Sequence, residues 1–388
     1  CVRDLIPGLD ASQLADIKKA LLAQREGYGP DTAIGLVPNL AASRVANRLD
    51  LCGPAYTVDA ACASSLLAVD QAAGELLRGR ADLMIAGGVH LCQDAGFWSV
   101  FCQLGALSRS QVIRPFDQRA DGLLIGEGIG LVVLERVEAA ERSGRRIYAV
   151  LAGTGVASDG RATSLMVPRV EGQVRALQDA WRTVGRGAES VGLIEAHGTG
   201  TPAGDGAELE TLARVFGPAG DGPRAALGSV KSMIGHTMPA AGAAGLIKAA
   251  LAIHHGVLPP TLHCEEPHDG VEATRFRLLN EAEPWPSDAP RLAGVNAFGF
   301  GGINAHVVLE EPGCRTVPRR LAVTPPSSPR PLLLAADSPQ GLRQALDAAT
   351  TNPSTREPPG DGLFRLAIAD PTPARLATGR TYRPSILS

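Results

Sequence analysis

The chain has 388 residues, of which 45% are hydrophobic and only 4% aromatic, with 37 Lys and Arg against 40 Asp and Glu. This length allows two or three domain-sized units with a large buried core, which excludes a disordered chain and a mini-protein. The formal net charge of −3 supplies no basic surface for nucleic acid, and no apolar run is long enough for a membrane-spanning helix. The N-terminus also has no basic-then-apolar signal layout. We therefore expect a cytoplasmic protein that binds neither nucleic acid nor membrane.

The seven cysteines indicate neither a disulfide framework nor a ribbon-type zinc site, because their number is odd and no C-x-x-C pair occurs. The stretch richest in histidine and cysteine is HHGVLPPTLHCEEPH, residues 254–268. Its prolines and its lack of a repeated short ligand spacing are typical of a loop that follows a helix. We therefore predict no metal site.

The first part of the chain predicts helices and strands in alternation. An amphipathic helix is indicated by the helical spacing of Leu14, Ile17, Leu21 and Leu22. Further on, AYTVD at 55–59 and DLMIAGG at 82–88 are typical of strands. Between them we expect a helix from Cys62, with an inward face made of Leu66, Leu67, Val69, Ala73, Leu76 and Leu77.

A second unit, from about residue 147, repeats this alternation. Its predicted strands are IYAVLAG, VGLIEA, AALGSV, AGVNAF and AHVVLEE, and its predicted helices are EGQVRALQDAW, GDGAELETLARVF and AAGAAGLIKAALAIHH. Strands as apolar as these must be buried on both faces. The sequence thus predicts an α/β fold of two related halves, with layered sheets covered by helices.

The composition changes after Pro312, since 12 of the 29 prolines fall in the last 75 residues. Within this part, LLLAADSPQGLRQALDAAT and LFRLAIADPTPARLA each predict a strand followed by a short helix. We therefore expect a main domain at 1–312 and a Pro-rich linker region, with a small α/β portion, at 313–388.

Cys62 is the first candidate for chemistry, because it follows a predicted strand and begins a predicted helix. Unpaired N–H groups and the helix dipole at such a position stabilise a thiolate, so we expect Cys62 to be the thiol with a raised thiolate fraction. A cysteine between two alanines is also typical of a buried apolar residue. This feature alone leaves both interpretations open.

Two further strand ends carry histidines. His197 ends an apolar strand in IEAHGTGTPAGD, before a glycine-rich loop in which Thr199 and Thr201 add hydroxyl groups. His236 follows Lys231 in GSVKSMIGHTMPAAGAAG, near the start of a predicted helix whose dipole keeps the imidazole neutral. A neutral imidazole can donate its Nε2–H to an oxyanion.

The glycine-rich segments do not predict a nucleotide site. The pattern GxxxxGK[ST] is absent, and GEGIG at 126–130 lacks dinucleotide spacing, so we expect that segment to pack a helix closely on a strand. In VNAFGFGGINAHVV, the glycines Gly299, Gly301 and Gly302 permit a tight turn that presents backbone N–H groups. The turn lies at a strand end, where α/β sheets place their ligands.

These four segments together resemble the β-ketoacyl synthases of the thiolase superfamily. DAACASSL matches the nucleophile motif of that family, EAHGTGT its first histidine motif, KSMIGHTMPAAG its lysine and second histidine motif, and NAFGFGGINAH its glycine-rich turn. The motifs occur in the family's order, and RPFDQRADGLLIGEGIGLVVLE at 114–135 matches as well. The resemblance covers about residues 30–311 and implies a thiolase-like duplicated α-β-α-β-α layered fold.

The resemblance implies a decarboxylative Claisen condensation in polyketide or fatty-acid-like chain elongation. Cys62 would carry the acyl chain as a thioester, while His197 and His236 would hold the malonyl thioester and stabilise its enolate. Lys231 would orient the two histidines by its charge and hydrogen bonds. Such a condensation needs a good leaving thiolate and an oxyanion hole, and it requires no metal or nicotinamide.

The resemblance also assigns the remaining site residues. The N–H groups of Cys62 and Phe300 would form the oxyanion hole, and Phe300 would gate the acyl pocket. Substrate contacts would come from Thr199, Thr201, Gly299 and Gly301, with the two threonines binding the phosphopantetheine arm. That arm belongs to an acyl carrier protein, and the domain itself would bind no cofactor.

Within the family, the chain resembles iterative type I polyketide synthases that make enediynes, polyunsaturated fatty acids or glycolipid chains. Gly245 stands where discrete fatty-acid enzymes often have Glu, and GLIKAAL with HHGVLPPTLHCEEPH resembles the iterative group. The Pro-rich tail resembles the connector to an acyltransferase domain. The implied partners are an acyl carrier protein, acyl and malonyl thioesters, an adjoining acyltransferase domain and a second copy in a homodimer.

The chain departs from the family pattern at one point, and two alternative functions stay open. Cys62 comes early compared with the family, which implies that the N-terminal part of the domain, and with it a working homodimer, lies outside this sequence. A non-elongating ketosynthase-like module that binds carrier protein or scaffolds an assembly is the alternative, and loss of a catalytic residue would favour it. A thiolase is a weaker alternative, because it would need a second nucleophilic cysteine in place of the first histidine motif.

Overall fold

The computed structural model describes residues 8–23, 29, 32–35, 37–92, 94–161, 167–220, 222, 224–286, 288–314, 332–351 and 363–368. The chain divides into two compact units, Cys1–Thr316 and Val317–Ser388. In the second unit, β11 (Leu332–Ala336) pairs antiparallel with β12 (Phe364–Ile368), and α12 (Pro339–Thr351) contacts both strands. The predicted strand and helix at 332–351 are confirmed, while the helix predicted after β12 lies outside the described residues.

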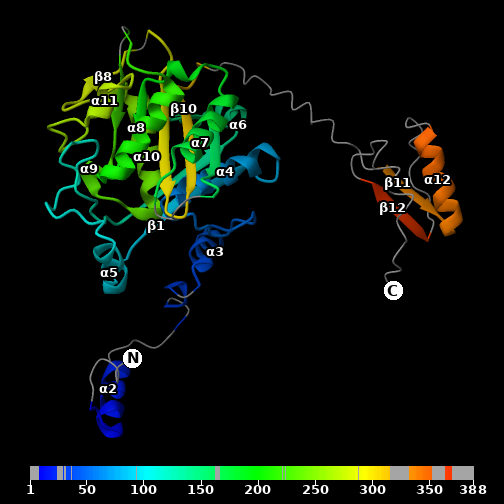
Figure 1. Ribbon diagram of the computed structural model, residues 1–388, viewed down its shortest axis with the longest axis horizontal. Coiled ribbons are helices and arrows are strands. Elements are labelled where there is room, and N and C mark those ends of the chain that lie inside the picture. The colour runs from blue at the N-terminus through cyan, green and yellow to red at the C-terminus, as the bar shows by residue number, and fades with distance from the viewer. Residues whose placement is uncertain are drawn as a thin grey trace. The chain divides into compact units, whose positions relative to one another are not determined.

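The first unit contains a six-stranded sheet with the order β3-β10-β9-β4-β5-β7. Figure 1 labels strand β10 of this sheet. Strand β10 is antiparallel to both of its neighbours, and the other neighbouring strands are parallel. The strands predicted for the second half are confirmed. Their bounds are β3 Val150–Ser158, β4 Leu193–Glu195, β5 Ala225–Gly228, β7 Phe276–Leu278, β9 Leu292–Gly299 and β10 Ile303–Glu310.

Alternate residues of these strands face two different helix layers, as expected for strands buried on both faces. Val307 and Leu193 belong to a core shared with helices α4 (Ser64–Leu77) and α10 (Ala241–His255). Val308 and Ile194 belong to a core shared with α7 (Val170–Thr183) and α8 (Pro202–Phe216) on the opposite face. The sheet therefore lies between two helix layers.

A second, two-stranded sheet also packs on α4 and α10. It pairs β1 (Leu83–His90) antiparallel with β2 (Gly128–Glu135). The strand predicted at 55–59 is wrong, because no strand of the described part lies beside that segment to share its hydrogen bonds. Leu77 was also expected to face inward, yet it is 83% exposed, because it is the last residue of α4.

Shorter elements complete the first unit. They are α2 Ala11–Ala23, α3 Asn39–Arg48, α5 Ala95–Gln103, α6 Val137–Arg142, α9 Lys231–Ile234, α11 Asp269–Glu272, β6 Val257–Leu258, β8 Glu283–Pro284 and the 3-10 turns η1 Thr32–Gly35 and η3 Ala188–Ser190. Helix α2 confirms the predicted N-terminal helix, although Leu21 and Leu22 are exposed on it. In the described part of the chain, no helix has both the length and the apolar character needed to cross a membrane.

The two halves repeat one local structure. Each central helix follows a 3-10 turn, η2 (Ala61–Ala63) before α4 and η4 (Met238–Ala240) before α10. Both turns begin with a residue of positive φ, 48° at Ala61 and 46° at Met238. Each helix is then followed by an antiparallel strand pair, β1 with β2 or β9 with β10. The predicted duplication is thus visible in backbone conformation as well as in element order.

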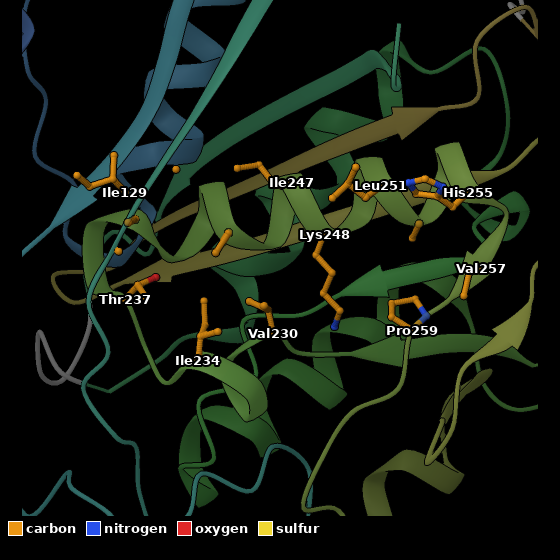
Figure 2. Close-up of a pocket in the computed structure, with 15 residues that line it drawn as sticks. Ile129, Val230, Ile234, Thr237, Ile247, Lys248, Leu251, His255, Val257 and Pro259 are labelled. Atoms are coloured by element: carbon orange, nitrogen blue, oxygen red, sulfur yellow. The ribbon is translucent and has the colours of Figure 1, made fainter. Parts of the chain in front are cut away.

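Strands β2 and β10 are equivalent in the two halves, but the second edge of each strand differs. Strand β10 pairs with β3 on the edge that faces away from β9, whereas β2 pairs only with β1 among the described residues. An apolar groove of about 520 Å³ lies beside β2, lined by Ile129 of that strand and by Ile247 and Leu251 of α10 (Figure 2). At Gly130 a Cβ would lie 3.0 Å from the Cβ of Ala243, so the GEGIG segment packs β2 closely on α10 as predicted.

Because β3 packs closely on α7, we expect the stability of the fold to depend strongly on Gly155. A Cβ at this position would lie 2.1 Å from the carbonyl oxygen of Ala176, so Gly155→Ala should lower the free energy of unfolding by about 2 kcal/mol or more. Gly206→Ala is the control, because a Cβ there meets no atom within 4 Å on helix α8 and should stabilise by up to about 1 kcal/mol. Denaturant unfolding of both variants measures the difference, and equal effects would contradict the packing described here.

Candidate active site

Cys62 lies in turn η2, directly before α4, and is 6% exposed. The turn is held by short-range hydrogen bonds, since Ala61 N–H donates to Asp59 Oδ1 at 2.9 Å and Ala60 N–H donates to Ser64 Oγ at 2.8 Å. The positive φ of Ala61 turns the chain sharply at the residue before the cysteine. The thiol is therefore fixed at the start of a helix, where the sequence places it.

His236 lies against this thiol, with its Nε2 atom 3.1 Å from Cys62 Sγ. Met238 N–H donates to His236 Nδ1 at 3.2 Å, so in the neutral ring the proton is on Nε2 and points at the sulfur. The backbone of His236 is held by Leu124 and Gly126, because His236 N–H donates to Leu124 O and Gly126 N–H donates to His236 O. The LLIGEG segment thus positions the second histidine.

His197 completes a compact group of three side chains. The sulfur of Cys62 and one ring nitrogen of each histidine lie within 4.8 Å of one another. The two imidazole rings meet edge to face, with centroids 5.4 Å apart. Glu208 fixes the turn at His197, since its carboxylate accepts the N–H groups of His197 and Gly198, each at 2.8 Å. The structure therefore brings together the three residues that the sequence singled out.

Burial keeps both histidines neutral. It lowers the pKa of His197 and of His236 well below the ordinary value of 6.5, and the positive charge of Lys231 adds to this effect. Lys231 is itself 2% exposed, and burial lowers its pKa while the nearby carboxylates of Glu195 and Glu208 oppose that shift. The expectation of a neutral imidazole at His236 is confirmed, although burial is its main cause.

The expectation of a raised thiolate fraction at Cys62 is wrong. Burial raises the pKa of the Cys62 thiol to about 11, and this outweighs the opposing effects of Lys231 and of the backbone amides of Phe300 and Cys62. Removal from water disfavours the charged form more than the helix start favours it. In the resting site the thiol is therefore protonated.

The glycine-rich turn brings the Phe300 amide to the sulfur. A Cβ at Gly299 would lie 2.4 Å from the carbonyl oxygen of Ala60, so only glycine allows this turn to lie so close to the cysteine segment. Gly301 and Gly302 follow with φ of 90° and 78°, which reverse the chain. The amides of Phe300 and Cys62 both act on Sγ, and the Phe300 side chain is 40% exposed.

Thr199 and Thr201 lie in the loop that follows His197. Their hydroxyl oxygens are 2.9 Å apart and hydrogen-bonded to each other. Thr199 is buried and Thr201 is half-buried. The pair therefore presents hydroxyl groups next to His197.

Sequence reasoning missed a buried polar chain that supports His197. Trp181 Nε1–H donates to His306 Nε2 at 3.1 Å, and His306 Nδ1 contacts Asn296 Oδ1 at 2.6 Å. Asn296 Nδ2–H donates in turn to Glu208 Oε1 at 2.8 Å. The signal available in the sequence was weak, namely an acidic residue in the helix after HGTGT and the Asn and His on either side of the glycine turn.

Comparison with known proteins decides the family. The β-ketoacyl synthase N-terminal domain matches residues 8–140, its C-terminal domain matches 148–265, and a ketoacyl-synthetase C-terminal extension matches 267–371. The solved ishigamide ketosynthase/chain length factor is 32% identical with a TM-score of 0.68, and the match covers 77% of this chain and 72% of that one. The chain belongs to the β-ketoacyl synthase family.

The relatives of this ketosynthase are polyketide synthases. Polyketide synthase ThaG of Burkholderia thailandensis is 42% identical over 76% of this chain, and erythronolide synthase EryA3 of Saccharopolyspora erythraea is 40% identical over 82%. The chain spans 6% and 10% of the length of these two proteins. A ketosynthase from module 6 of the bacillaene synthase of Bacillus subtilis 168 matches with a TM-score of 0.68 at 31% identity, covering 88% of this chain and 62% of that one. These likenesses confirm the predicted thiolase-like α/β fold.

The raised pKa of Cys62 predicts the pH dependence of its alkylation. Because only the thiolate reacts, the rate of labelling by iodoacetamide should rise about tenfold per pH unit up to the pKa of about 11. Lys231→Met should slow labelling at each pH at which Lys231 is charged, since that charge lowers the pKa of Cys62, whereas exposed Lys18→Met should not. Peptide mapping of labelled Cys62 measures the rates. A plateau at or below the ordinary value of 9.0 would contradict the shift.

Glu208 should act as a positioning residue for His197. Glu208→Gln replaces an acceptor oxygen with an NH2 group that faces N–H donors, which leaves a buried donor unpaired and should cost about 1–3 kcal/mol of stability. Glu210→Gln, on the exposed face of the same helix, should cost less than about 0.5 kcal/mol. Thermal unfolding compares the two variants. Equal melting temperatures would show that Glu208 does not hold this loop.

Proposed function

We propose that this ketosynthase condenses an acyl chain on Cys62 with a malonyl unit delivered by an acyl carrier protein. One observation carries the proposal. The Cys62 sulfur is faced at once by the Nε2–H of neutral His236 and by the amides of Cys62 and Phe300, with His197 beside them. Hydrogen-bond donors gathered in a buried site stabilise negative charge that develops on a reacting oxygen.

In the first half-reaction, Cys62 Sγ attacks the carbonyl carbon of the incoming acyl thioester. The amides of Cys62 and Phe300 stabilise the oxyanion, the carbon–sulfur bond to pantetheine breaks and a carbon–sulfur bond to Cys62 forms. The proton of the Cys62 thiol passes to the departing pantetheine thiolate. This balance fits a thiol whose pKa is raised to about 11, because no resting thiolate is required.

In the second half-reaction, the carbon–carbon bond to the malonyl carboxylate breaks and carbon dioxide leaves. The electron pair remains as an enolate, whose oxygen accepts hydrogen bonds from the neutral imidazoles of His197 and His236. The enolate carbon then attacks the Cys62 acyl carbonyl, and the carbon–sulfur bond breaks. The released Cys62 thiolate accepts a hydrogen bond from the Nε2–H of His236, as the sulfur does in the resting structure, and it takes up a proton from water to restore the thiol.

Because Cys62 and His236 are assigned to different half-reactions, we expect their variants to lose different activities. His236→Ala should still become acylated at Cys62 but should lose roughly a hundredfold or more in carbon dioxide release from malonyl carrier protein, because the enolate charge appears only in the second step. Cys62→Ala should lose acylation and keep some decarboxylation. Intact-protein mass and labelled carbon dioxide release are measured on the same samples. Equal loss of both reactions in folded His236→Ala protein would overturn the assignment.

The same experiment distinguishes the condensing enzyme from the alternative function. A non-elongating module that only binds carrier protein would neither acquire an acyl group on Cys62 nor release carbon dioxide. The presence of Cys62, His197 and His236 within one compact group favours the active enzyme.

Several finer assignments belong to this proposal. Thr199 and Thr201 bind the phosphopantetheine arm, Phe300 gates the acyl pocket and Gly299 and Gly301 shape the substrate contact. The domain works as a cytoplasmic homodimer next to an acyltransferase domain, in an iterative synthase. The support for the iterative subtype is the GLIKAAL and HHGVLPPTLHCEEPH segments. The iterative subtype is tested by mass analysis of the products that the protein forms with malonyl carrier protein, since an iterative enzyme extends one acyl chain several times.

A further inference from the structure

A row of aromatic rings leads away from the reactive cysteine. Phe300 stacks on Phe101 with centroids 6.0 Å apart, Phe101 contacts Phe97 at 5.1 Å, and Phe97 contacts His90 at 5.4 Å. Phe97 and Phe101 are one turn apart on α5, and His90 is the last residue of β1. The row therefore connects the glycine-rich turn at Cys62 with the end of the small sheet.

The side chains around this row are apolar. Cys62 itself belongs to a buried cluster with Phe101, Ile113, Leu123 and Met238, against which Phe97 also packs. An alkyl chain attached to Cys62 Sγ would therefore lie among these side chains, where its transfer from water is favourable.

His90 is the exception in these surroundings. It lies on the same face of β1 as Gly88, where a Cβ would be 2.6 Å from the carbonyl oxygen of Pro239 in turn η4, so this face is turned toward the His236 segment. His90 is only 7% exposed, and its Nε2 atom has no hydrogen-bond partner in the described part of the protein. A buried polar atom without a partner is unfavourable, whereas Leu or Phe would fill the space without this cost.

The lowered pKa of His90 keeps its imidazole neutral, and a neutral imidazole can form a hydrogen bond with a substrate oxygen. Burial lowers the pKa of His90, and the charge of Glu127 opposes the shift. His90 also acts on the pKa of His236, which places it near the reacting groups. A neutral imidazole either donates to a ketone oxygen or accepts from a hydroxyl group through Nε2, depending on its tautomer.

We propose that His90 determines substrate specificity by forming the polar end of the acyl pocket and hydrogen-bonding an oxygen, as hydroxyl or ketone, on the chain carried by Cys62. This inference rests on the proposed function. It gives the substrate class as oxygen-bearing acyl thioesters in preference to saturated ones. A site built to hydrogen-bond a substrate oxygen discriminates strongly against an analogue that lacks it.

The experiment measures the rate of Cys62 acylation in the full chain by intact-protein mass. The probes are octanoyl pantetheine and octanoyl pantetheines that carry one hydroxyl group at different carbons. We expect at least one hydroxylated chain to react roughly tenfold faster than octanoyl in the wild-type protein. His90→Leu should remove this preference while octanoyl reacts at least as fast as before. A merely structural role of His90 would slow both chains alike.

Two further variants keep the test decisive. His90→Asn retains a hydrogen-bonding group and should keep part of the preference, which also covers the outcome that His90→Leu fails to fold. His254→Leu makes the same change at an exposed position of α10 and should leave the preference intact. The inference about His90 would be overturned if both His90 variants kept the full preference for the hydroxylated chain, or if the wild-type protein showed no such preference. The proposed function would stand in either case. Failure of every thioester to acylate wild-type Cys62 would overturn the proposed function itself.

Discussion

The site depends on the meeting of two helix starts. Ser65 Oγ in the first turn of α4 accepts the N–H of Ala243 in the first turn of α10, at 2.9 Å across the central layer. This hydrogen bond fixes the two 3-10 turns against each other, one carrying Cys62 and the other beginning two residues after His236. The duplicated fold thus supplies the proposed nucleophile, Cys62, from one half and a hydrogen-bond donor, His236, from the other. Each half repeats the strained residue that sharpens its turn, Ala61 or Met238.

Burial of this junction sets the charge state of all three reacting side chains. Removal from water raises the pKa of the Cys62 thiol and lowers the pKa of both histidines, so each is neutral at rest. The polar groups that point into the site are therefore donors without formal charge. Such donors stabilise the negative charge of an oxyanion or enolate as it forms. Burial therefore disfavours a resting thiolate but keeps the histidines neutral, as donors to an oxyanion or enolate.

The sequence predicted α2, α4 and β1 in the first half and the strands of the second half, and it failed at AYTVD for a physical reason. Strands such as β4 and β10 are apolar and lie inside a complete sheet, so their pattern alone indicates their structure. AYTVD has the same local pattern, yet a strand also needs a neighbour for its hydrogen bonds, and none lies beside it in the described chain. Cys62, His197 and His236 were predictable because each lies at an element end within a long motif. Glu208, Asn296 and His306 were not, because their partners are distant in the sequence and only the fold brings them together.

The buried charge of Lys231 shows why this site differs from one built on a thiolate and imidazolium pair. The charge of Lys231 lowers the pKa of Cys62 and also lowers the pKa of His197 and His236, so it opposes transfer of the thiol proton to either ring. The Met238 N–H acts in the same direction, because it occupies Nδ1 of His236 and leaves the ring proton on Nε2, facing the sulfur. His236 can donate to Sγ but has no free lone pair there with which to accept. In the proposed mechanism the thiol proton therefore leaves with the departing pantetheine sulfur, and the imidazoles remain neutral for the enolate that forms next.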